Sequence, residues 1–246
     1  MQIALGAALA AVVALVAFRT RALSRGGAAA AFGIGTAIFA TAGWPGAAAL
    51  FAFFVPSALL SRIGNGAAQT RNGWQVFANG GVAAICALLA VRGGAPFAAG
   101  FAGAFAAASA DTWGTEIGIR WGRAPISILT FRRVDIGRSG GITLVGSLAT
   151  LGGAFCVAVV AALVHLAPLW TVALGGVAGA MADSILGASI QALRWCPNCA
   201  RECETRRHEC GTPAIMRRGL SWIENDAVNF AATLCGAGVA ALLAIS

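Results

Sequence analysis

The chain has 246 residues, of which 59% are hydrophobic and only 11% are charged. A typical soluble domain has about 25% charged residues, so an ordinary water-soluble fold is excluded. The net charge is +8, but the arginines that carry it border apolar segments. Membrane topology therefore explains this charge better than nucleic-acid binding does, and we expect no nucleic-acid partner.

Eight apolar segments approach the roughly 20 residues that cross a 30 Å hydrocarbon core, and in lipid such segments must be helical to satisfy their backbone hydrogen bonds. We predict an all-α, polytopic bundle of about eight transmembrane helices that forms one integral membrane domain over 1–246. Two of the predicted spans, 27–43 and 46–60, are short and adjacent in sequence, which is typical of a tight hairpin. The predicted spans are 2–18, 27–43, 46–60, 75–91, 97–118, 141–164, 168–193 and 221–245.

The basic residues are distributed very unevenly among the connections between these segments. All seventeen are arginines, and every one except Arg92 lies in the first, third, fifth or seventh connection. Because positive charge marks cytoplasmic loops, we predict that these connections are cytoplasmic and that both termini are non-cytoplasmic. No basic residue precedes the first apolar run, so that run is expected to be retained as a helix. The Ala- and Arg-rich, Lys-free composition favours a bacterial inner (plasma) membrane.

Polar side chains converge at the predicted cytoplasmic ends of four helices. The desolvation of a buried acid must be offset by a cation, a partner or protonation, so each intramembrane acid is a functional candidate. Several oxygen ligands near a membrane surface suit Mg²⁺, which typically binds a few carboxylates together with substrate phosphates. The candidate catalytic residues are Asp111, Asp183, Glu116 and Asp226, and the first three are the predicted Mg²⁺ ligands.

The fifth connection combines arginines with glycines before a predicted helix N-terminus. Arginine donates bidentate hydrogen bonds to phosphate, glycine allows close approach of the backbone, and a helix N-terminus offers free N–H groups. These features predict phosphate or nucleotide binding. The candidate ligands are Arg132, Arg138, Gly140 and Gly141, with the amides Asn79, Asn225 and Asn229 on neighbouring helices. Glu224 follows Ser221 at the spacing of a capping box, which favours a structural role for Glu224.

The seventh connection, a predicted cytoplasmic loop at 194–220, contains four cysteines and a histidine. Cys196 and Cys199 form a C-x-x-C knuckle, and a cytoplasmic location disfavours stable disulfides. We predict a structural Zn²⁺ site with Cys196, Cys199 and Cys210 as ligands and His208 or Cys203 as the fourth. The alternative is a reduced loop without metal.

Five ordered motifs resemble those of the integral membrane family known as domain of unknown function 92, which includes a plant phytyl-phosphate kinase and the animal transmembrane protein nineteen. The resemblance covers about 55–235. The motifs are QVFANGG at 75–81, SADTWGTEIG at 109–118, GGITLVGS at 140–147, DSILGA at 183–188 and NDAVN at 225–229. The chain departs from the commoner family pattern at Asp135, at Arg138-Ser139 and at Asn225-Asp226.

The resemblance implies a nucleotide-dependent kinase, using CTP or ATP, that converts phytyl or polyprenyl phosphate to the diphosphate at the cytoplasmic membrane face. The expected partners are a nucleoside triphosphate, an isoprenyl-phosphate lipid and membrane lipids. Catalysis would rest on positioning and charge neutralisation, because an acceptor phosphate oxygen is already anionic. The alternatives are a lipid-phosphate nucleotidyltransferase, an ion- or proton-coupled secondary transporter that uses Asp111 and Asp183, and a structural membrane protein.

Overall fold

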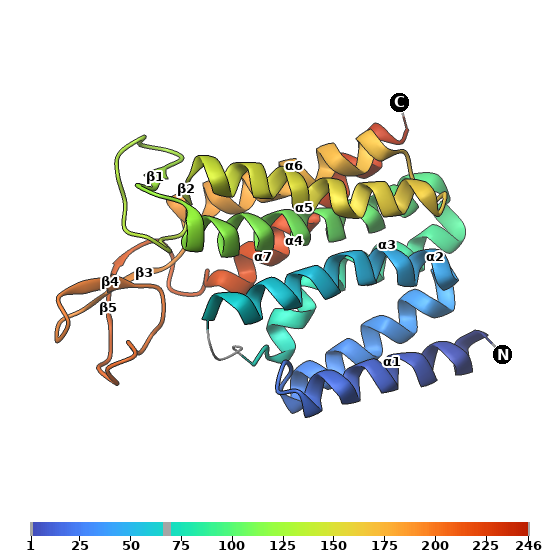
Figure 1. The fold of residues 1–246 in the computed structure, drawn as a ribbon, viewed down its shortest axis with the longest axis horizontal. Coiled ribbons are helices and arrows are strands. Elements are labelled where there is room, and N and C mark those ends of the chain that lie inside the picture. Colours follow the sequence, from blue (N-terminus) through green and yellow to red (C-terminus); the bar gives the residue numbers. More distant parts are fainter. Residues whose placement is uncertain (1, 66–69, 246) are drawn as a thin grey trace.

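The computed structural model describes residues 2–65 and 70–245. Its helices lie side by side in a bundle, with short strands at one end (Figure 1). The helices are α1 (Gln2–Arg19), α2 (Arg25–Asn65), α3 (Gly73–Gly93), α4 (Ala95–Trp121), α5 (Leu144–Leu163), α6 (Leu169–Ser189) and α7 (Asn225–Leu243). Five of them, α2, α3, α5, α6 and α7, are long and apolar enough to cross a membrane. The prediction of a mainly helical chain with several membrane spans is thus confirmed.

The two short segments predicted at 27–43 and 46–60 are the two arms of α2. A straight helix of 41 residues would be roughly 60 Å long. Instead, Gly43 has φ 58° and ψ −144°, a conformation that glycine tolerates best, and Pro45 lacks the N–H needed to continue the helical hydrogen bonding. Gly27, near the start of α2, lies against the Arg71 carbonyl just beyond its end. The described residues therefore form seven helices, with α2 folded back on itself.

Helix α4 supplies the centre of the core, because it packs against α2, α3, α5, α6 and α7. Every residue from 99 to 110 is buried. Small residues bring the backbones close: a Cβ at Gly103 or at Gly175 would lie 2.6 Å from the carbonyl oxygen of Gly236. Close packing through small residues is how membrane helices associate, and here it joins α4, α6 and α7.

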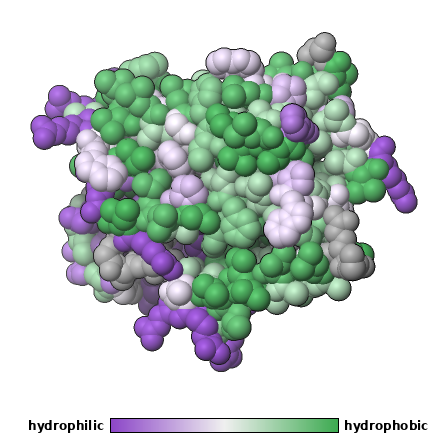
Figure 2. Space-filling model, turned by 45° about the vertical axis from the view of Figure 1, so that its right-hand side comes forward, coloured by the Kyte–Doolittle hydropathy of each residue, from purple (hydrophilic) through white to green (hydrophobic). Residues whose placement is uncertain are grey.

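The outside of the bundle is largely apolar. Figure 2 shows hydrophobic side chains over most of one face, with hydrophilic side chains mainly at its edges. Leu148, Leu163 and Trp170 are among the large apolar side chains that are exposed. Both ends of the described chain lie at one end of the bundle, and the strands lie at the other (Figure 1). Which end faces the cytoplasm stays a prediction.

Two small antiparallel sheets correct the all-α prediction. In the first, β1 (Ile126–Ser127) pairs with β2 (Gly141–Ile142). The second has the strand order β4–β3–β5. Its strands are β3 (Leu193–Cys196), β4 (Arg201–Cys203) and β5 (Ile215–Arg218).

These strands shorten two of the predicted helices. The helix expected at 141–164 begins at Leu144, because Thr143 caps it by accepting a hydrogen bond from the Gly146 N–H at 3.0 Å. The helix expected at 168–193 ends at Ser189, and the chain then enters β3. Apolar runs cannot distinguish the end of a helix from a short buried strand.

Candidate functional site

A polar cavity of about 360 Å³ lies at the end of the bundle that holds the strands. Helices α2 to α7, the segment before α5 and the residue after β4 contribute to its wall. The polar residues that line it include Ser61, Arg71, Gln75, Asn79, Asp111, Thr112, Thr115, Glu116, Arg138, Ser139, Thr143, Ser147, Thr150, Asp183, Ser184, Glu204, Asn225 and Asn229. Most of the predicted site residues therefore meet in one place.

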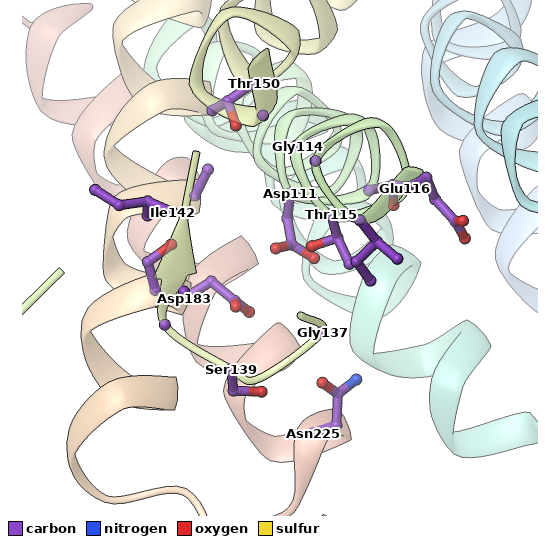
Figure 3. Close-up of a pocket in the computed structure, with 18 of the residues that line it drawn as sticks. Asp111, Gly114, Thr115, Glu116, Gly137, Ser139, Ile142, Thr150, Asp183 and Asn225 are labelled. Carbon is purple, nitrogen blue, oxygen red and sulfur yellow. The ribbon is translucent and has the colours of Figure 1, made fainter. Parts of the chain in front are cut away.

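Close packing of α4 against α6 brings Asp111 and Asp183 together. A Cβ at Gly179 would lie 2.4 Å from the Ala107 Cβ, so the two backbones nearly touch at that level. Asp111 and Asp183 each follow this contact by four residues, which is about one helical turn. Figure 3 shows the two carboxylates directed toward the same space in the cavity.

One oxygen of this carboxylate pair lacks the partner that a buried acid normally has. The Oδ2 atom of Asp183 is buried and has no hydrogen-bond partner among the described residues. A buried carboxylate without compensation is costly, whereas a bound cation would offset its charge. Two carboxylates from neighbouring helices that line one polar cavity fit the few-carboxylate coordination that is typical of Mg²⁺.

Glu116 lines the same cavity but has a different environment. Ser61 Oγ donates a hydrogen bond of 2.8 Å to Glu116 Oε1, and Arg71 Nη2 donates one of 3.1 Å to Ser61 Oγ. Figure 3 shows the Glu116 carboxylate directed away from Asp111 and Asp183. The three acids predicted to bind one Mg²⁺ ion are therefore not grouped together, and Glu116 instead orders the region around Arg71.

Arg71 places a positive charge beside the cavity. Burial lowers the pKa of its guanidinium from the ordinary value, while the negative charge of Glu116 raises it. Arginine stays protonated at neutral pH. A cation that is already positioned by Ser61 is a suitable ligand for a phosphate group.

The loop before α5 closes one side of the cavity. Gly140 has φ 75°, and a Cβ there would lie 2.4 Å from the Ala188 Cβ at the end of α6, so the loop rests directly on that helix. The N–H of Ser139 donates to Glu204 Oε1 at 2.9 Å, and the N–H of Gly141 donates to the Arg138 carbonyl at 3.0 Å. The sequence predicts free backbone N–H groups at residues 140 and 141. This prediction is wrong for Gly141, because α5 begins later and the Gly141 N–H already donates to a carbonyl group.

The two predicted phosphate-binding arginines are placed differently. Arg138 lines the cavity, and its Nη1 lies 3.0 Å from Glu202 Oε2. Arg132 is exposed and does not line the cavity. Only Arg138 is therefore positioned to reach a ligand there.

The amides predicted on α3 and α7 line the cavity, whereas Asp226 does not. Asn225 and Asn229 lie one turn apart on one face of α7. On α3, Asn79 Nδ2 donates to the Gln75 carbonyl at 2.9 Å, which leaves its carboxamide oxygen for other partners.

The expected capping role of Glu224 is wrong. Glu224 occupies the N-cap position of α7 but makes no side-chain cap hydrogen bond. Its Oε1 instead accepts from Arg194 at 2.8 Å and from Arg206 at 2.7 Å. The hydrogen bond from Arg206 lowers the pKa of the Glu224 carboxyl, so Glu224 stays ionised and anchors the sheet to α7.

A second cavity, of about 170 Å³, adjoins the first and is almost entirely apolar. Residues of α1 and of both arms of α2 line it, among them Ala10, Gly35 and Phe54. Arg71, Gln75 and Asn79 line both cavities. A polar chamber and an apolar chamber therefore meet at these three side chains.

Several residues of the site lie outside the sequence-based prediction. Glu204 could not be located from the sequence, because it belongs to the cysteine-containing loop and reaches the cavity only through the fold. The hydroxyl groups of α5 do have a signal: Thr143, Ser147 and Thr150 are spaced by four and three residues, which places them on one helical face.

The cysteine-containing loop brings four of its predicted ligands together. The ligand atoms of Cys196, Cys199, His208 and Cys210 all lie within 4.8 Å of one another. Cys203 is not in this group, and its Sγ instead lies 3.8 Å from the Thr205 carbonyl oxygen.

A known protein family matches most of the length of the chain. A family model described as Integral membrane protein DUF92 matches residues 8–237. The chain belongs to this family. The predicted resemblance and the integral membrane class are confirmed, while a bacterial inner membrane stays a prediction.

Relatives from plants and archaea share most of this chain's length. Protein PGR of Arabidopsis thaliana is 29% identical over 89% of each chain. An uncharacterised membrane protein of Methanocaldococcus jannaschii is 31% identical over 72% of this chain and 78% of its own. Protein VTE6, chloroplastic, of Arabidopsis thaliana is 28% identical over 90% of this chain and 65% of its own. No solved structure matches the chain.

Proposed function

We propose that this DUF92 protein is an isoprenyl-phosphate kinase that transfers the terminal phosphate of CTP or ATP to phytyl or polyprenyl phosphate. The observation that carries the proposal is the pair Asp111 and Asp183, which face one space in a polar cavity that adjoins an apolar one. The motif resemblance to a family with a plant phytyl-phosphate kinase supports the same activity.

The nucleotide side of the reaction is assigned to the polar cavity. Asp111 and Asp183 would hold Mg²⁺, which when bound neutralises charge on the phosphates. Arg138 would donate to a phosphate after exchanging its partner Glu202, with which it forms a part-exposed ion pair. Such surface pairs contribute about 0–1 kcal/mol, so this exchange costs little. Asn225 and Asn229 add amide donors from α7.

The lipid side of the reaction is assigned to the apolar cavity. The isoprenyl chain would lie between α1 and α2, where the lining is almost entirely apolar. Its phosphate would then reach Arg71, Gln75 and Asn79, which border both cavities. In this arrangement the acceptor phosphate would lie next to the donor while the isoprenyl chain stays in an apolar environment.

Transfer needs no strong base in this arrangement. An anionic oxygen of the acceptor phosphate attacks the terminal phosphorus of the nucleotide, the bond from that phosphorus to the bridging oxygen breaks, and the nucleoside diphosphate leaves with the electron pair. Neither His165 nor His208 lines the cavity. Asp111, Asp183, Arg71 and Arg138 would act by positioning and charge neutralisation.

The test is label transfer by purified protein in lipid, with Mg²⁺ and with phytyl, geranylgeranyl or undecaprenyl phosphate. Label from γ-labelled CTP or ATP is expected in the lipid diphosphate, and label from the α-position is expected to stay in the nucleotide. Label from the α-position in the lipid, with release of pyrophosphate, would identify a nucleotidyltransferase instead. Absence of transfer with every pair, in protein shown to be monodisperse, would refute both activities.

A further inference from the structure

The ligand atoms of the cysteine cluster lie close enough together for a tetrahedral metal site. Cys196 Sγ lies 3.6 Å from Cys210 Sγ, and His208 Nδ1 lies 3.3 Å from Cys210 Sγ. In a zinc tetrahedron with bonds of about 2.3 Å to sulfur and 2.0–2.1 Å to nitrogen, two sulfurs lie about 3.8 Å apart and a sulfur–nitrogen pair about 3.5 Å apart. The observed separations are close to these values, so a metal ion fits with little movement of the ligands.

The ligands come from two turns that flank the three-stranded sheet. Cys196 ends β3 and Cys199 lies in the turn toward β4, while His208 and Cys210 lie between β4 and β5. Gly211 follows Cys210 with φ 82°, and its N–H donates to the His208 carbonyl at 2.8 Å. Two such knuckles facing one another are the usual structural zinc arrangement.

This segment also lacks an apolar core of its own. None of the residues from 197 to 220, all of which the structure describes, is buried. Three strands of three or four residues with no apolar core of their own are not expected to be stable, and small units of this kind commonly depend on a metal ion or disulfides. A metal ion is the cross-link that the ligand set offers.

We propose that Cys196, Cys199, His208 and Cys210 bind a structural zinc ion that holds the β4–β3–β5 sheet over the polar cavity. The complete ligand set leaves no open position for catalysis. Cys203 is excluded because it lies outside the cluster. This proposal does not depend on the kinase activity.

The sheet, in turn, holds the loop that closes the cavity. Gln191 Nε2 and Ser139 Oγ both donate to Glu204 Oε2 at 2.8 Å, and the Ser139 N–H donates to Oε1. Arg194 Nη1 donates to the Glu204 carbonyl at 2.5 Å, and Arg194 also bonds Glu224 at the start of α7. Loss of zinc would therefore release Glu204 and with it the loop around Ser139.

The test measures zinc in protein purified in detergent through an affinity tag without histidines. About one zinc per chain is expected in the wild-type protein and in the matched control Cys203→Ser. Cys196→Ser and Cys210→Ser are expected to lose most of it. Wild-type protein without zinc, or with a disulfide between Cys196 and Cys210 in its place, would overturn the proposal, as would retention of zinc by both variants.

If the cysteine variants fail to fold, a second measurement on the wild-type chain tests the proposal. Exchange of zinc for cobalt is expected to give the absorption bands of tetrahedral cobalt with thiolate ligands. Removal of zinc by a chelator is expected to speed trypsin cleavage at Arg201, Arg206 and Arg207 at least about tenfold. Unchanged cleavage after proven zinc removal would show that the metal does not hold the sheet.

Discussion

At the residue scale, the direction of each side chain distinguishes the four acidic candidates for the site more sharply than their depth in the membrane does. Asp111 and Asp183 are directed toward one space in the cavity, Glu116 is bonded to Ser61, and Asp226 lies outside the lining. Consecutive residues on a helix are about 100° apart. Asn225 and Asn229 therefore lie about 40° apart on α7, and both line the cavity, whereas Asp226 does not.

The residue-scale prediction compares carboxylates inside and outside the cavity. Asp111→Asn and Asp183→Asn keep the side-chain size but remove the charge that would hold Mg²⁺. Each should lower the rate of phosphate transfer by roughly 10²-fold or more, because charge stabilisation by a metal ion is worth several kcal/mol. Asp226→Asn should change the rate by less than about threefold. The measurement is initial rate at saturating nucleotide, in variants with wild-type melting behaviour. A large loss in Asp226→Asn with little loss in the other two would contradict the assignment.

At the scale of elements, helix contacts decide which residues become neighbours. Ala107 and Gly179 set the separation of α4 and α6, and a Cβ at Gly179 would also lie 2.7 Å from the Ala232 carbonyl oxygen on α7. One glycine thus fixes the distance among the three helices that carry Asp111, Asp183 and Asn229. The site depends on this packing as much as on its own polar groups.

Substitution of two glycines in similar helices tests this close packing at the scale of elements. Gly179→Ala places a methyl group where there is no space, and overpacking of this kind costs about 1–3 kcal/mol. Gly238→Ala is the matched control, since a Cβ at Gly238 meets nothing within 4 Å. Thermal unfolding in detergent should show a lower Tm only for Gly179→Ala. Equal Tm values for the two variants would mean that α4, α6 and α7 do not pack as closely as described.

The elements also show what the sequence can and cannot predict. Helix positions follow from apolar runs, and the depth of Asp111 and Asp183 follows from their place in those runs. The strands at 141–142 and 193–196 are missed because their apolar residues continue neighbouring helical runs. Glu204 is missed for another reason: it lies 65 residues after Ser139 in sequence, and only the folded sheet brings them into contact.

At the scale of the whole molecule, the arginine-bearing connections and the strands gather at the end opposite the chain termini (Figure 1). The positive-inside rule predicts that this end is cytoplasmic, which would give the polar cavity access to cytoplasmic nucleotides. Alkaline phosphatase fused after residue 245 in a bacterial host should therefore be active, and fused after residue 130 it should be inactive. A fluorescent protein that requires the cytoplasm to fold should give the reverse pattern. Activity of both phosphatase fusions would reject this topology.

The apolar cavity leads to a prediction about KM for the lipid substrate. Ala10 on α1 lines the apolar cavity, while Ala8 on the same helix is exposed and lies outside its lining. Ala10→Phe would fill space that the isoprenyl chain is proposed to occupy, so it should raise KM for phytyl phosphate several-fold while leaving KM for the nucleotide unchanged. Ala8→Phe adds the same ring on the lipid-facing side and should alter neither constant. If Ala10→Phe leaves the lipid KM unchanged, the chain binds elsewhere, and the junction at Arg71 then serves the nucleotide alone.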